Sequence, residues 1–165
     1  LNMNLREDKA WSYGYRSRVS RNTSGAMTFS TAGKVQTDKT AESMQEILKE
    51  LAAFSGDAPA TTTEVERLKL NQSRSLPGSY STNGGFLSAI VTSDAYGLPY
   101  DYAASAGDRI DAVTADGVAE RGRRVIDTDR LTWVVVGDLA EIEDKVRALD
   151  YGPVEVWDAF GNRIR

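Results

Sequence analysis

Two segments near the N-terminus place a large residue at every second position. The first covers residues 11–19 and the second residues 27–35, and the turn-forming sequence NTSG separates them. A period of two is typical of a half-buried strand, so the sequence predicts a long antiparallel hairpin. Gly33 lies inside the second strand, where a glycine indicates a bulge, a close approach of another backbone, or only a weak point.

Apolar residues after the hairpin change to a helical spacing. Met44, Ile47, Leu48 and Leu51 fall at i, i+3, i+4 and i+7, which predicts an amphipathic helix. A second helix is expected to begin at Thr61, because Glu64 follows at the spacing of a capping box.

Six further elements are expected towards the C-terminus. We expect residues 77–78 (Pro-Gly) to break the second helix and residues 86–91 to form a third, which stops around residues 97–99. The later predictions are two short helices at 102–113 and 115–125, the latter capped by Thr114; a β-branched strand at 131–136; a helix capped by Asp138 with Glu141; and a short strand at 154–157.

The predicted strands are segregated from the helices along the chain. This order indicates an α+β fold, with helices packed on one face of a largely antiparallel sheet. A length of 165 residues is enough for one core, so we expect a single domain over residues 1–165. Leu1 and Leu5 share the spacing of a helix face, so the chain is expected to start inside a helix of a longer parent.

The absence of histidine and cysteine limits the chemistry of the chain. Catalytic zinc sites and hydrolase triads are usually built on these residues, so we expect no metal, no cofactor and no hydrolytic centre in this chain. The net charge is -4 and basic residues are scattered among acidic ones, which argues against a nucleic-acid partner. No apolar run approaches the ~20 residues that span a bilayer, so no membrane partner is expected.

Several polar motifs have ordinary interpretations. The pair Gly84-Gly85 lacks the spacing of a phosphate loop and predicts a turn or a helix start. The basic residues at 121–124 are typical of a solvated helix face. The acidic residues at 7–8, 101, 108 and 111 do not have the spacing of a calcium loop and are expected at the surface.

Arg6 and Tyr13 are the candidate binding residues. Seven positions separate them, across the expected junction of the first helix and the first strand. A guanidinium and a phenol that converge there could donate hydrogen bonds to a substrate carbonyl and to the oxyanion it becomes during attack. The alternative is structural: Arg6 pairs with a nearby acid and Tyr13 packs in the hairpin.

Residues 5–14, with the sequence LREDKAWSYG, closely resemble a segment of the pitrilysin/insulinase-type zinc metallopeptidases, which include proteins like the mitochondrial processing peptidase. In that family the segment follows the long helix of the C-terminal half-domain. Further segments resemble the family in family order: TDKTAE at 37–42, RSLPG at 74–78, YGLPYDY at 96–102, VTAD at 113–116, DRL at 129–131 and VVVGD at 134–138.

The resemblance implies one half of a two-part enzyme. Family members have two similar halves that face each other across a chamber. The first half carries the zinc motif H-x-x-E-H, which this chain lacks. The second half supplies an arginine and a tyrosine, matched here by Arg6 and Tyr13, which reach towards the bound peptide. Position 10 departs from the family, with alanine in place of the usual glycine.

The chain is therefore expected to be a non-catalytic, substrate-holding C-terminal domain, with the first strand and most of the first helix missing before Leu1. Its expected partners are a peptide and a zinc-bearing peptidase domain or subunit, and such a fragment is expected to associate with itself through an exposed sheet edge or apolar groove. The alternative is a structural or assembly subunit of the same fold without peptidase activity. The sequence leaves the compartment open between periplasm and cytoplasm.

Overall fold

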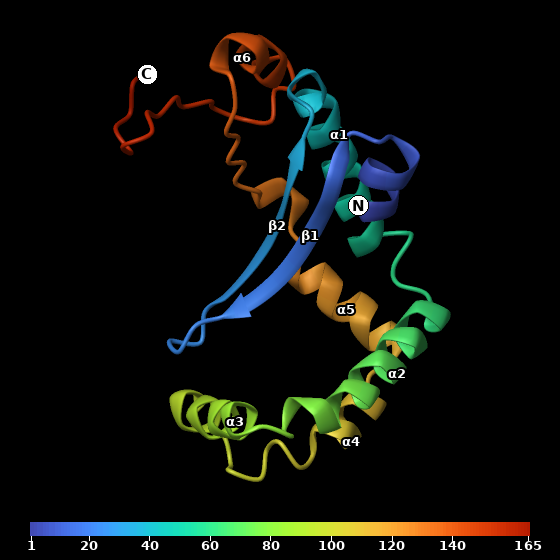
Figure 1. Cartoon of the computed structure of the whole chain (residues 1–165). Coiled ribbons are helices and arrows are strands. Elements are labelled where there is room, and N and C mark those ends of the chain that lie inside the picture. The colour runs from blue at the N-terminus through green and yellow to red at the C-terminus, as the bar shows by residue number, and fades with distance from the viewer. The chain divides into compact units, whose positions relative to one another are not determined.

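The computed structural model describes all 165 residues and shows the expected mixture of helices and an antiparallel sheet (Figure 1). Its elements are η1 (Met3–Asp8, a π-helical turn), β1 (Ser12–Arg21), β2 (Met27–Val35), η2 (Thr37–Lys39), α1 (Thr40–Ser55), α2 (Thr62–Ser79), α3 (Asn83–Tyr96), α4 (Ala106–Asp111), α5 (Ala115–Val125), η3 (Thr128–Arg130) and α6 (Leu139–Arg147). The α+β class is confirmed. The sheet has two strands, β1 and β2.

The predicted hairpin is confirmed. Asn22 closes its turn, because its backbone N–H donates to the carbonyl of Ala26 at 3.0 Å and its side-chain oxygen accepts from the Ala26 N–H at 2.9 Å. Gly33 marks a close approach, one of the three interpretations that the sequence left open. A β-carbon there would lie 2.8 Å from the carbonyl oxygen of Gly14 and 2.1 Å from a ring carbon of Tyr15.

The chain divides into two compact units. The first consists of Leu1–Ser17, Thr31–Glu50 and Asp129–Arg165, and its buried apolar residues include Leu5, Met44, Ile47, Ile142 and Val156. The second consists of Arg18–Ser30 and Leu51–Thr128, and it buries Leu51, Val65, Ala119 and Ile126. The single domain expected from the sequence stays a prediction.

The predicted N-caps Thr61, Thr114 and Asp138 are confirmed, but Glu141 completes no capping box with Asp138. Thr61 and Glu64 form the full capping box of α2, in which the Thr61 N–H donates to the Glu64 carboxylate at 2.8 Å. Thr114 accepts from Gly117 at the start of α5, and Asp138 accepts from Ala140 at the start of α6. These short-range signals are reliable because both partners lie on one turn of chain.

Two helix predictions need correction. The predicted break at residues 77–78 is wrong, because α2 continues through Pro77 to Ser79. Pro77 leaves out one backbone hydrogen bond of the helix, and α2 ends two residues later. The helix predicted at 102–113 is too long, since only Ala106–Asp111 is helical. Residues 99–104 instead form successive turns, in which Tyr102 donates to Pro99 and Ala104 to Asp101.

Two strand predictions also need correction. Residues 131–136 form no strand, and the side chain of Val136 is 93% exposed. A β-branched run becomes a strand only where another strand supplies a hydrogen-bonding partner, and neither strand of the hairpin pairs with it. Near 154–157 there is a single antiparallel bridge between Trp157 and Arg163.

A large area of the protein is exposed. The total is 12115 Å² for 18.0 kDa. Two separate compact domains of half this mass would together expose roughly 9,700 Å². Large apolar side chains, among them Tyr13, Val136 and Phe160, contribute to this exposed area. None of the helices has both the length and the hydropathy that crossing a bilayer requires.

Candidate functional site

The candidate site is built around η1, which carries Arg6. Leu5 anchors this turn because its side chain is completely buried. The Lys9 N–H donates to the Asn4 carbonyl at 3.0 Å, and the Trp11 N–H donates to the Leu5 carbonyl at 2.9 Å. These bonds close the turn and direct the chain into β1.

Asn4 ties η1 to α1 through two carboxylates one helical turn apart. Its side-chain nitrogen donates to Glu46 at 2.8 Å and to Glu50 at 2.9 Å. Both carboxyl groups have a lowered pKa, chiefly because Asn4 donates to them. Lys9, 3.4 Å from Glu46, and the terminal amine of Leu1, 3.3 Å from Glu50, lower the pKa values further.

The junction between η1 and β1 depends on an unusual backbone conformation. Ala10 has a φ of 53°, in the left-handed region that disfavours residues with a β-carbon. Its carbonyl accepts from the side chain of Gln36 at 3.2 Å. A glycine at position 10 would be unstrained in this conformation.

Lysine side chains border the start of β1. The Trp11 ring lies 4.8 Å from the ammonium of Lys9 and 5.7 Å from that of Lys39, within the range of cation–π attraction. The next residue, Ser12, donates its hydroxyl to the carbonyl of Lys34 at 2.7 Å. These contacts hold the first residues of β1 against β2 and the segment after it.

The structure places both predicted site residues at the surface. Arg6 forms an ion pair with Glu7, with 3.3 Å between Nε and the carboxylate oxygen, and both side chains are about half exposed. Tyr13 is 97% exposed. The two side chains make no hydrogen bond with each other, and Tyr13 does not pack in the hairpin as the structural alternative expected. Whether the pair converges on a peptide stays a prediction.

Asn2 and Tyr15 form a further contact between η1 and β1, which no pattern in the sequence indicated. The Asn2 side-chain oxygen accepts from the Tyr15 N–H at 3.1 Å and so connects the start of η1 to β1. Tyr15 is half-buried, and burial raises the pKa of its phenol. The spacing of Glu46 and Glu50 puts two carboxylates on one face of α1, but nothing in the sequence indicated that Asn4 would donate to them.

The residues of this chain do not fit a catalytic zinc ion. The chain has no histidine or cysteine, and no three acidic side chains converge in a way that could hold a metal. The carboxylates of Glu46 and Glu50, which bind η1, are occupied by Asn4 and by cations, and Glu7 is paired with Arg6. Arg6 and Tyr13 can bind and orient a peptide group, and they can stabilise negative charge on an oxygen.

No protein-family model matches the chain, and a search of curated proteins finds no match to it.

Proposed function

We propose that the chain is a non-catalytic, substrate-holding half of a pitrilysin/insulinase-type zinc metalloendopeptidase. In this proposal it is one half-domain of that fold, and the zinc and its ligands belong to another domain or subunit. The peptide is held by Arg6 and Tyr13. The family segments of the sequence and the α+β composition of the structure support this assignment.

The exposed phenol of Tyr13 carries the proposal. Tyrosine rings in a hairpin usually bury much of their area against neighbouring side chains, because the ring is a large apolar surface. Tyr13 instead leaves nearly all of its side chain in solvent. A phenol that its strand holds away from the rest of the protein is free to donate a hydrogen bond to a bound molecule.

Arg6 fits the same role. Its present partner, Glu7, forms a half-exposed ion pair, and such pairs contribute only about 0–1 kcal/mol. A peptide carbonyl could replace this partner at little cost. The positions of η1 and β1 are fixed by the bonds of Asn4 and Asn2, so the backbone that carries both donors is organised before substrate binds.

The chemical contribution is stabilisation of charge. As a nucleophile attacks a peptide carbonyl, the oxygen gains negative charge, and a donor aimed at it binds the transition state more strongly than the ground state. A zinc-bearing partner would supply the attacking hydroxide. Tyr13 would donate one hydrogen bond to the developing oxyanion, and Arg6 would hold an adjacent carbonyl.

The proposal is tested by the reading frame upstream of Leu1 and by reconstitution. We expect an H-x-x-E-H motif in the parent chain or in a neighbouring subunit. Assembly of that part with this chain should cleave a fluorogenic peptide, and either part alone should not. Absence of the motif from both would contradict the proposal, and would favour an assembly subunit of the same fold.

A further inference from the structure

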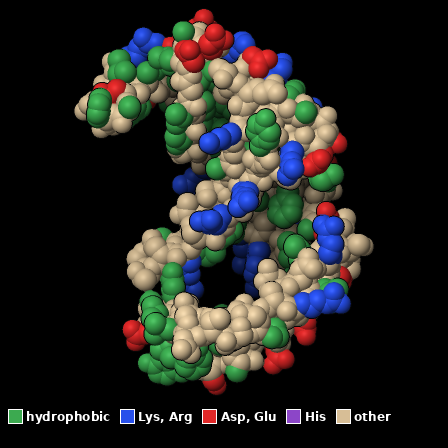
Figure 2. Space-filling model, in the orientation of Figure 1, with side chains coloured by type: hydrophobic (Ala, Val, Ile, Leu, Met, Phe, Trp, Pro, Cys, Tyr) green, Lys and Arg blue, Asp and Glu red, His purple; other side chains and the backbone are tan.

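Helix α3 is apolar on more than one face and yet is largely uncovered. Phe86, Leu87, Ile90 and Val91 are all exposed, Leu87 by 59% and Val91 by 57%. A helix with apolar residues all round is typical of a buried position. Figure 2 shows hydrophobic side chains gathered over α3 and the segment after it. The helix therefore lacks a partner that would cover it.

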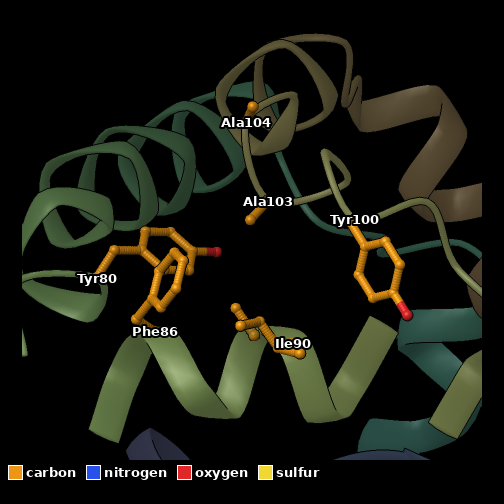
Figure 3. A pocket seen from close by; sticks show the side chains of 7 residues that line it. Tyr80, Phe86, Ile90, Tyr100, Ala103 and Ala104 are labelled. Carbon is orange, nitrogen blue, oxygen red and sulfur yellow. The ribbon is translucent and has the colours of Figure 1, made fainter. Parts of the chain in front are cut away.

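One face of α3 borders a pocket of about 550 Å³ (Figure 3). Phe86 and Ile90 project from α3 into it, and Tyr80, at the end of α2, lies beside Phe86. The opposite wall is formed by Ala103 and Ala104, whose small side chains leave the space open. The lining contains no charged residue, so the pocket suits an uncharged apolar group.

An apolar row lies beside this pocket on the same helix. Leu87 and Val91 are one turn apart, and each is one position, about 100° around the helix, from a residue that lines the pocket. The row of Leu87 and Val91 on α3 is therefore next to a hollow that α3 forms together with Tyr80 and residues 100–104. Such a surface can be complementary to itself under a two-fold rotation, in which the row of each copy enters the hollow of the other.

The charge distribution favours contact between identical chains at this surface. The chain has a net charge of -4, so two copies repel each other over most of their surfaces. No charged residue occurs from position 75 to position 93, which covers the end of α2 and most of α3. Two copies that meet here avoid placing like charges against each other.

The exposed area of this surface is slightly below that of a standard interface and above that of the largest apolar patch of an ordinary monomer. The exposed parts of Tyr80, Phe86, Leu87, Ile90, Val91 and Tyr100 amount to roughly 700 Å². A standard interface buries about 800 Å² on each partner, whereas the largest apolar patch of an ordinary monomer is about 300–600 Å².

We propose that a second copy of this chain packs on α3, with Leu87 and Val91 of each copy in the pocket of the other. The association is through α3 and the pocket and does not use the edges of the hairpin. It does not depend on the proposed peptidase function, because it involves neither Arg6 nor Tyr13.

Sedimentation equilibrium of the 165-residue chain over a wide concentration range tests this proposal. We expect a monomer–dimer equilibrium. Leu87→Glu and Val91→Lys should each raise the dissociation constant roughly 30-fold or more, the scale of a central interface residue. The matched controls Val134→Glu and Val136→Lys, at 84% and 93% exposure in a segment far away in sequence, should leave it unchanged.

A further variant distinguishes insertion into the pocket from non-specific hydrophobic association. Ala103→Trp fills the pocket and also adds apolar area. It should weaken the dimer if Leu87 and Val91 insert into the pocket, and it should strengthen association if the contact is non-specific. Leu87→Ser provides a mild variant, and circular dichroism checks that each variant keeps its helix content. The proposal would be overturned if the wild-type chain stays monomeric or forms large mixed aggregates. It would also be overturned if the Val134 and Val136 variants weaken the dimer as much as the Leu87 and Val91 variants do.

Discussion

The ring of Tyr15 on β1 occupies the space in which a side chain at Gly33 on β2 would begin. A β-carbon on Gly33 would lie 2.1 Å from the ring carbon Cδ2 of Tyr15, far inside van der Waals contact. The two strands can therefore pair at this position only with a glycine on β2 or with a displaced tyrosine ring on β1.

Gly33→Ala should destabilise the protein by about 1–3 kcal/mol, the usual cost of overpacking. Urea unfolding followed by circular dichroism measures this. Gly107→Ala is the matched control, because a β-carbon at Gly107 in α4 meets no atom within 4 Å and should be neutral or slightly stabilising. In a Tyr15→Ser background the penalty at Gly33 should shrink, and an unchanged penalty would mean that the ring is not its cause.

The stability of the protein should decline in acid through Glu46 and Glu50. Folding lowers the pKa of both carboxyl groups below the ordinary value of 4.5. Their contribution is therefore fully present above that value and is lost as the pH falls through the lowered pKa values. The free energy of unfolding, measured by urea titration at several pH values below neutral, should decrease in this range.

Asn4→Ala should reduce both the stability at neutral pH and the size of this acid effect, because Asn4 is the main cause of both pKa shifts. The loss at neutral pH should be about 1–3 kcal/mol, as expected for hydrogen bonds to charged groups. Asn71→Ala, at an exposed position of α2, serves as control. Equal acid sensitivity in the Asn4 variant and the wild type would contradict this explanation.

Ala10→Gly should stabilise the protein by roughly 0.5–1 kcal/mol. The left-handed conformation costs a residue with a β-carbon about 1–2 kcal/mol, and the greater freedom of glycine in the unfolded chain cancels part of the gain. Thermal unfolding measures the shift. Ala52→Gly in α1 is the control and should lose about 1 kcal/mol, because Ala52 lies in a regular helix. Destabilisation by Ala10→Gly would count against the strain at position 10.

Tyr13→Phe should lower kcat of the assembled peptidase by about 10²- to 10³-fold, with a smaller change in KM, because the phenol donates mainly to the developing oxyanion. Arg6→Ala should affect both constants, since the guanidinium also holds the peptide before attack. Steady-state kinetics should be accompanied by unfolding curves. Parental activity in two well-folded variants would show that these residues do not contact the reacting peptide.

The isolated chain should bind no stoichiometric zinc at a catalytic site. Carboxylates alone rarely form such a site, and the chain offers neither imidazole nor thiolate. Metal analysis after equilibrium dialysis measures the zinc content. One equivalent of retained zinc, together with peptide cleavage by the pure chain, would disprove this prediction.

Local signals in the sequence predicted the structure well where both partners lie close together along the chain. Thr61 with Glu64 located the start of α2, and the alternation around residues 11–35 located the hairpin. The strand predicted at residues 131–136 is absent because strand formation depends on a partner strand elsewhere in the fold, which β propensity does not reveal. The break predicted at Pro77 failed because the loss of one backbone hydrogen bond there did not end α2 until two residues later.

The candidate site was predictable only in part. The residue types of Arg6 and Tyr13 and their spacing across a helix–strand junction were visible in the sequence. The bonds of Asn4 to Glu46 and Glu50 join positions more than forty residues apart, so no local pattern indicated them. The apolar excess of α3 was visible, but its lack of cover is a tertiary property.

The division of the chain into two units limits how it can be cut. Each unit is assembled from separate stretches, and both the hairpin and α1 contribute residues to each. A gene fragment that ends at Glu50 would encode the first unit without its third stretch, Asp129–Arg165. Of the second unit it would encode only Arg18–Ser30, the tip of the hairpin. No single cleavage by a protease can therefore release either unit intact, and neither can be transplanted into another protein as one contiguous segment.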